Sequence, residues 1–113
     1  MKRETILPGQ LDLLVLALLA RRPAHGYAVL EALRVRSGGL FDLPEGSLYP
    51  ALYRLEQAGF LKSDSRVVAG RTRRTYAITA AGRAGLRERQ AAWQKLVHSI
   101  TAVIGEGPVP DHG

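Results

Sequence analysis

The sequence predicts a mainly α fold with a two-stranded β wing. An amphipathic segment of helical period covers residues 46–58, and two alternating segments, 61–68 and 72–79, follow it around a turn at Ala69-Gly70. Arginines crowd the tip of this hairpin: Arg71, Arg73 and Arg74. A helix followed by an arginine-tipped hairpin is the order of a winged helix-turn-helix, which offers one helix to a DNA groove and a loop to the flanking backbone. The pattern therefore indicates a DNA-binding protein.

The first helix is expected from about Pro8 or Gln10 to Ala20. Its apolar residues recur at helical spacing and form one continuous face: Leu11, Leu14, Val15, Leu18 and Leu19. The rest of this helix is also apolar, with Asp12 as almost its only polar residue. Other elements must therefore cover the helix on both sides. A second helix is expected from His25-Gly26 to about Arg36, where a run of serine and two glycines ends it.

The third helix is predicted to have one buried face and one exposed face. Its buried face is predicted to hold Leu48, Ala51, Leu52 and Leu55, and the opposite face Gly46, Pro50, Tyr53, Arg54 and Gln57. Ser47 is a good N-cap, and that assignment places Pro50 at the third helical position, where its missing N–H has no intrahelical partner to lose. We therefore expect this helix to begin at about Gly46-Ser47, to expose its first turn and to end at Gly59.

A last helix is expected from Ala80 to about Ile104, capped by Thr79. At about 1.5 Å per residue it would be roughly 35–40 Å long, longer than the small domain beneath it. Its distal half has an apolar stripe with nothing in its own chain to cover it: Trp93, Leu96, Val97, Ile100, Val103 and Ile104. An exposed stripe of this kind marks an interface. We thus expect a DNA-binding domain at 1–79, a C-terminal dimerisation helix at 80–104 and a flexible tail at 105–113.

Composition agrees with this reading. A chain of 113 residues with 46% hydrophobic residues is large enough for one small globular domain. A net charge of +6, carried mostly by arginine, favours a polyanionic partner, first nucleic acid and second an anionic membrane surface. No cysteine is present, which excludes disulfides and thiolate sites. The apolar run 11–20 follows a helix-capping region, unlike a signal peptide, and is too short to span a bilayer, so we expect a soluble, cytoplasmic protein without membrane contact.

Three stretches resemble the signature segments of the PadR-type transcriptional regulators. They read HGYAVLEAL at 25–33, GSLYPALYRLEQAGFL at 46–61 and GRTRRTYAITAAGR at 70–83, and the likeness extends over about residues 8–100. The resemblance implies a bacterial dimeric repressor with an N-terminal winged helix, and the single terminal helix resembles the short subfamily. Ala28 departs from the family, which usually carries an acidic residue after the HGY triplet.

The resemblance also implies roles for individual residues. The DNA-reading helix would present Ser47, Tyr49, Pro50, Tyr53 and Arg54. The wing would place Arg71, Arg73 and Arg74 beside the minor groove or its phosphates, while His25 and Tyr27 would lie near the backbone. The partners implied are double-stranded DNA with an inverted-repeat operator and a second copy of the chain.

For several residues the sequence leaves open whether the role is structural or is contact with DNA or a ligand. Tyr49 lies at the boundary between the buried and exposed faces of its helix, whereas Tyr53 is expected to be exposed and Tyr76 to be in the core. Arg54 is either a DNA contact or an ordinary surface residue. Trp93 has two compatible interpretations: a dimer-interface anchor, and part of a pocket between subunits for a small planar aromatic or cationic ligand, as in some relatives of the short subfamily.

The sequence offers no catalytic or metal-binding constellation. Its three histidines lack metal-ligand spacing, no glycine-rich loop precedes a helix, and no serine has a nucleophile-elbow context. We therefore expect no enzyme and no cofactor. Our prediction is a homodimeric winged-helix repressor of a roughly palindromic operator, in which Trp93, Leu96, Val97, Ile100 and Ile104 form the dimer interface and a possible ligand site. The rival interpretation is a protein-interaction module whose apolar last helix binds a different protein.

Overall fold

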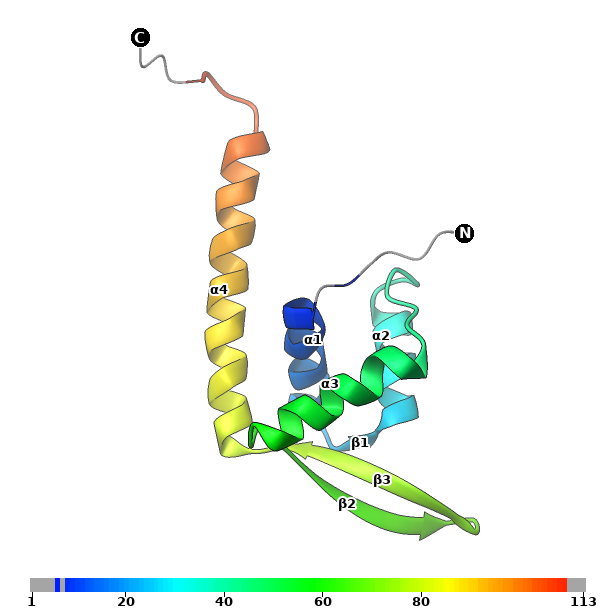
Figure 1. The fold of residues 1–113 in the computed structure, drawn as a ribbon. Helices are drawn as coiled ribbons and strands as arrows, with labels where there is room; N and C mark the ends of the chain where they lie inside the picture. Colours follow the sequence, from blue (N-terminus) through cyan, green and yellow to red (C-terminus); the bar gives the residue numbers. More distant parts are fainter. Residues whose placement is uncertain (1–5, 7, 110–113) are drawn as a thin grey trace.

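The computed structural model describes residue 6 and residues 8–109, and the structural statements below concern these residues. The helices are α1 (Pro8–Arg21), α2 (Gly26–Arg36), α3 (Glu45–Gln57) and α4 (Ala80–Ile104), and the strands are β1 (Ala24–His25), β2 (Leu61–Val68) and β3 (Arg71–Ile78). Figure 1 shows α3 crossing α1 and α2, the hairpin of β2 and β3 projecting below them, and α4 leaving the domain as a long separate rod. The predicted winged helix-turn-helix fold is confirmed.

The sheet contains one strand that the sequence did not predict. β1 has only two residues and pairs antiparallel with β3, which gives a three-stranded sheet in the order β1-β3-β2. The next residue after β1 begins α2, and the His25 side chain caps that helix by accepting a hydrogen bond from the Ala28 amide at 3.2 Å. β1 thereby ties the start of α2 to the hairpin.

The hairpin turns at Ala69 and Gly70, as predicted, and both residues have positive φ, 52° and 77°. Two central residues in this conformation make the turn that matches the twist of a two-residue β-hairpin. The turn also fixes the register, so Arg66 lies opposite Arg73 and Ser63 lies opposite Tyr76. Register decides which side chains share a face of the sheet.

The core lies where α1, α2 and α3 meet the base of the sheet. Its largest fully buried side chains come from all three helices: Val15, Leu16, Leu19, Val29, Leu48 and Leu52. The predicted core residue Tyr76 is buried, and the first turns of α4 contribute Leu86. Full burial of each such aliphatic side chain stabilises the fold by about 1.5–3 kcal/mol, which is enough to hold α3 in one orientation.

The start of α3 corrects the sequence prediction. Ser47 is the third residue of the helix, not its N-cap, because the helix begins at Glu45 and Pro44 occupies the cap position without a side-chain hydrogen bond. The fixed φ of Pro44, −74°, suits this entry, and the Glu45 carboxylate in the first turn complements the helix dipole. Pro50 is therefore the sixth helical residue, and the bond that it cannot donate leaves the carbonyl of the exposed Gly46 to water.

α4 begins at Ala80 and is capped by Thr79, as predicted, since the Thr79 hydroxyl accepts a hydrogen bond from the Gly82 amide at 3.0 Å. Its 25 residues extend for about 37 Å. From Gln90 onward every residue of α4 is exposed. The predicted tail begins at Gly105, and its residues 110–113 lie outside the described residues.

Candidate nucleic-acid interface

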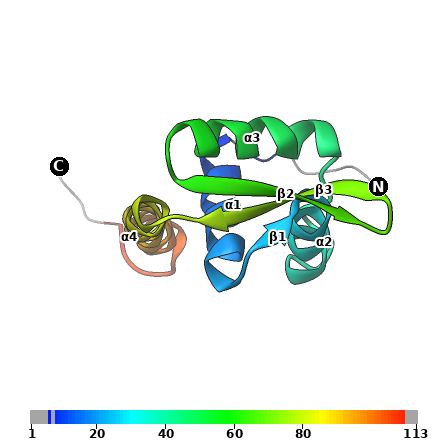
Figure 2. The same ribbon diagram turned by 90° about the horizontal axis from the view of Figure 1, so that it is seen from below.

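α3 presents one continuous exposed face. Figure 2, seen from below the domain, shows α3 on one side of the hairpin and α2 on the other, while α1 passes behind the strands. All of the α3 residues predicted to meet DNA are exposed: Ser47, Tyr49, Pro50, Tyr53 and Arg54. The opposite face of α3 is fastened to the core by four buried side chains, Leu48, Ala51, Leu52 and Leu55.

The two tyrosines of this face have different surroundings. Tyr53 is 64% exposed, in agreement with the prediction of an open aromatic side chain. Tyr49 is less exposed because it lies against the start of α2, where a Cβ atom added to Gly26 would come within 2.7 Å of the Tyr49 hydroxyl oxygen. Gly26 therefore makes room for Tyr49, and the boundary position expected for this side chain is confirmed.

Arg54 is not an isolated surface arginine. Its Nη2 atom donates a hydrogen bond of 2.7 Å to Oδ1 of Asp12 on α1. The Arg54 side chain is half exposed, whereas that of Asp12 is only 16% exposed. Sequence analysis recognised Asp12 only as a polar interruption of the first helix, because nothing in the sequence spacing brings residues 12 and 54 together.

The arginines of the hairpin lie on two different faces of the sheet. Arg74 shares a face with Tyr76, the face that meets the helices, and its Nη1 atom donates to the Ser63 hydroxyl at 2.8 Å. Ser63 in turn donates to Oε2 of Glu56 on α3 at 2.6 Å. This chain of hydrogen bonds links the base of the hairpin to α3. Burial raises the pKa of the adjacent Tyr76 phenol, which the positive charge of Arg74 partly opposes.

Arg71 and Arg73 belong to the other face of the hairpin, where Arg66 lies directly opposite Arg73. Like charges paired across two strands repel each other, and an anion that binds between them would relieve this repulsion. Arg66 also approaches Asp64 at 3.8 Å, but both side chains are largely exposed, so this ion pair is weak. Sequence analysis missed Arg66, although counting outward from the two-residue turn would have placed it beside Arg73.

The two residues predicted near the DNA backbone at the start of α2 also differ. Tyr27 is 59% exposed. His25 is partly buried, and its Nδ1 atom is engaged as the helix cap. A DNA contact by His25 is therefore left to its other ring nitrogen, Nε2.

The predicted interface residues of α4 are exposed in the single chain. Trp93, Leu96, Val97, Ile100 and Ile104 all keep between 41% and 77% of their surface accessible. Trp93 lines a hollow of about 410 Å³ between α4 and the start of α1, together with Gly9, Gln10, Leu13, Arg89, Ala92 and Leu96. This hollow is mostly apolar, and so a contiguous apolar surface extends from α1 to the free half of α4.

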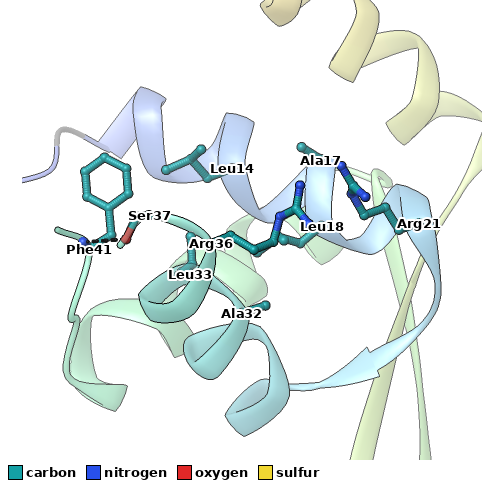
Figure 3. A pocket seen from close by; sticks show the side chains of 9 residues that line it. All are labelled: Leu14, Ala17, Leu18, Arg21, Ala32, Leu33, Arg36, Ser37 and Phe41. Atoms are coloured by element: carbon teal, nitrogen blue, oxygen red, sulfur yellow. Dashed lines mark hydrogen bonds between the residues drawn. The ribbon is translucent and has the colours of Figure 1, made fainter. Parts of the chain in front are cut away.

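A second hollow, of about 270 Å³, lies between α1 and α2. Figure 3 shows Leu14 and Leu18 of α1 on one side of it, Phe41 at one end, and Arg36 reaching from α2 toward α1. The Ser37 hydroxyl accepts a hydrogen bond from the Phe41 amide at 2.9 Å and so holds the connector after α2 in place.

Within the part of the chain that the structure describes, no three histidine, aspartate or glutamate side chains gather closely enough to hold a metal ion. None of the described helices combines the length and apolarity needed to cross a membrane.

Comparison with known proteins gives a consistent result. The family described as "Transcriptional regulator PadR-like family" matches residues 15–88. Transcriptional regulator Rv3488 of Mycobacterium tuberculosis is 47% identical over 60 residues, which are 53% of this chain and 56% of that protein. The matched segment thus spans little more than half the length of this relative.

Solved structures extend the comparison to most of the chain. A PadR family transcriptional regulator from Eggerthella lenta is 32% identical with a TM-score of 0.78, over 88% of this chain and 85% of that one. A transcriptional regulator from Clostridium thermocellum is 26% identical with a TM-score of 0.77, over 87% and 95% of the two chains. Family members are transcriptional regulators and not enzymes, which confirms the absence of an enzymatic function. The chain belongs to the PadR-like family of transcriptional regulators.

Proposed function

We propose that this regulator is a homodimeric repressor that binds a roughly palindromic operator. The observation that carries the proposal is the exposed face of α3, which presents Tyr53 and the ordered Arg54 guanidinium beside an arginine-rich hairpin. Ser47, Tyr49, Pro50, Tyr53 and Arg54 would enter the major groove, where base edges specify sequence. Tyr27 and the free ring nitrogen of His25 would meet the flanking backbone.

The wing would supply affinity without sequence preference. Arg71 and Arg73 were predicted to contact phosphates, and Arg66 joins them because it lies across from Arg73 on the same face. Arg74 would act nearer the base of the wing, where its hydrogen bond to Ser63 holds it. Each phosphate neutralised releases condensed counterions, so the affinity should fall steeply with salt.

A second copy of the chain would cover the apolar half of α4. The interface that we propose contains Trp93, Leu96, Val97, Ile100 and Ile104, which remain 41–77% exposed in the single chain. In a two-fold dimer the same surface serves both subunits, so the partner's α4 would also lie against the hollow formed by Leu13 and Trp93. A dimer of this kind would hold two α3 helices at a fixed separation, so its operator would be an inverted repeat.

The same hollow suits a small planar aromatic effector. Trp93 offers an aromatic face that is partly exposed, and Leu13, Ala92 and Leu96 supply apolar walls. A ligand that stacked on Trp93 would alter operator binding only if it favoured one spacing of the two subunits over another. A ligand that favoured the spacing unable to bind DNA would release the repressor from its operator.

The proposal is tested by footprinting the purified protein on the DNA upstream of its own gene. We expect two protected half-sites in inverted repeat, with centres about one helical turn apart, and lower transcription from that promoter in vitro. The affinity should drop steeply as the salt concentration rises. Protection without two-fold symmetry would refute the dimeric operator, and increased transcription would refute the repressor. A protein-interaction module would bind its partner with little response to salt and would leave no footprint.

A further inference from the structure

We propose that Asp12, on α1, is a positioning residue for DNA recognition, which acts by holding the Arg54 guanidinium in place on the exposed face of α3. The inference rests on the proposed function, because it assumes that α3 reads an operator. It assigns a role to a residue on a different helix, 42 positions away in the sequence. Asp12 itself does not have to touch DNA.

The geometry of the pair supports this role. The distance of 2.7 Å between Arg54 Nη2 and Asp12 Oδ1 is that of a strong, charge-assisted hydrogen bond. The Asp12 side chain is mostly buried between α1 and α3, so the carboxylate is a fixed anchor. Exposed ion pairs between long, mobile side chains contribute little, but here the carboxylate partner is short and largely buried.

Arg54 keeps most of its N–H donors available while it is bound to Asp12. A guanidinium has five N–H donors in a rigid planar fork, and the pair with Asp12 occupies one of its nitrogens. Among the described residues Arg54 has no second ion pair, and half of its side chain is open to solvent. Its remaining donors are thus available to a base or a phosphate.

Such an arrangement favours specific binding. Binding a free arginine side chain to a base requires that its rotamers be fixed, which opposes association. In this protein the ordering has already occurred in the absence of DNA. Arg54 is also expected to stay on Asp12 in the complex, because its departure would leave a largely buried carboxylate without a counter-charge.

The test compares Asp12→Asn with the wild-type protein on the footprinted operator and on random DNA of equal length, at one salt concentration. The asparagine keeps the shape of the side chain but removes its charge. We expect the ratio of operator affinity to random-DNA affinity to fall about tenfold, since a well-oriented base contact contributes discrimination of this order. Affinity for random DNA should stay the same or rise slightly, because a negative charge has been removed.

Three further variants separate positioning from a purely structural role. Asp12→Glu should recover most of the specificity ratio, because it restores a carboxylate. In an Arg54→Ala background, Asp12→Asn should change the ratio by less than about twofold, since its effect passes through Arg54. Glu31→Gln is the matched control: it breaks an exposed ion pair of 2.9 Å with Arg34 on α2 and should leave the ratio unchanged.

The outcomes distinguish this inference from the proposed function. A wild-type protein that protects no operator would refute the proposed function itself. A wild-type footprint with an unchanged ratio in folded, dimeric Asp12→Asn would make Asp12 only a bridge between α1 and α3. A raised ratio would show that Asp12 withholds Arg54 from DNA, which also overturns the proposal. If Asp12→Asn does not fold, Asp12→Ser decides, because it also removes the carboxylate and should lower the ratio, whereas an unchanged ratio would overturn the proposal.

Discussion

At the scale of single residues, the direction in which α4 leaves the domain depends on a close backbone contact at Gly82. The Thr79 hydroxyl donates to the Gly59 carbonyl at 2.6 Å, and the Thr79 amide donates to the Phe60 carbonyl at 3.0 Å. Gly82 packs so closely on this junction that an added Cβ atom would overlap the Phe60 carbonyl oxygen and approach Ile78 at 2.7 Å. These contacts join the end of α3, the hairpin and α4.

Gly82→Ala should therefore destabilise the protein although alanine is the better helix former. Propensity alone would favour the substitution by about 1 kcal/mol, but the overlap involves backbone and cannot be relieved by rotating a side chain. We expect a net loss of about 1–3 kcal/mol in the free energy of unfolding, measured by denaturant titration. Gly46→Ala is the control, since nothing lies within 4 Å of the added atom in α3, and it should be neutral or slightly stabilising. Equal effects of the two substitutions would contradict the close contact at Gly82.

At the scale of elements, the hairpin has two chemically different faces. Arg74 takes part in the hydrogen-bonded chain from the wing through Ser63 to Glu56 on α3. Arg73 lies on the opposite face beside Arg66, and among the described residues it has no carboxylate partner. The two neighbouring arginines should therefore contribute to DNA binding in different ways.

Arg73→Ala should weaken binding to all DNA sequences alike, because it removes one phosphate contact. The slope of log affinity against log salt concentration should flatten by about 0.9. Arg74→Ala should alter the slope by a similar amount or less and should in addition reduce operator specificity, since it releases the wing from α3. Titrations of operator and random DNA at several salt concentrations separate the two effects. An unchanged slope for Arg73→Ala would show that this face of the wing points away from DNA.

The elements could be predicted from sequence to the extent that local pattern determines them. Helical spacing identified the buried face of α3, and the alternation of β3 placed Tyr76 in the core. β1 could not be predicted from the sequence because two residues are too few to show a periodic pattern. They form a strand only through their pairing with β3. Ser47 was assigned as the N-cap because its hydroxyl is suited to that role, but the helix begins at Glu45 after a proline.

The candidate site was predictable only in part for the same reason. The exposed residues of α3 follow from helical phase, whereas the pairing of Arg54 with Asp12 depends on how α1 packs against α3. Arg66 required the register of the hairpin, and the link from Arg74 to Glu56 required the position of the sheet against α3. Contacts between elements distant in sequence leave no spacing pattern that a single sequence displays.

At the scale of the whole molecule, α4 has one half that packs on the domain and one half that is exposed. Its first turns pack on the domain through Gly82, Gly85 and Leu86, and all residues from Gln90 onward are exposed. The exposed half carries an apolar stripe that continues into the hollow beside α1. Two long helices that pair along this stripe would hold the domains apart as rigid arms. The stripe thereby connects the proposed dimer with the spacing of its operator half-sites.

Ile100→Glu should break this dimer without unfolding the domain, because Ile100 lies on the apolar stripe far from the core. Burying one such side chain is worth about 1.5–3 kcal/mol, and the two-fold axis makes each substitution count twice. The dissociation constant should rise by a factor of at least about 100, with further loss from burying the introduced charges. Ala102→Glu is the matched control: it adds the same charge to the opposite side of α4 and should leave the dimer intact. Sedimentation of both variants decides between the faces, and operator affinity should fall only where the dimer is lost. A dimer unaffected by Ile100→Glu would place the interface elsewhere and would leave the stripe to a different partner.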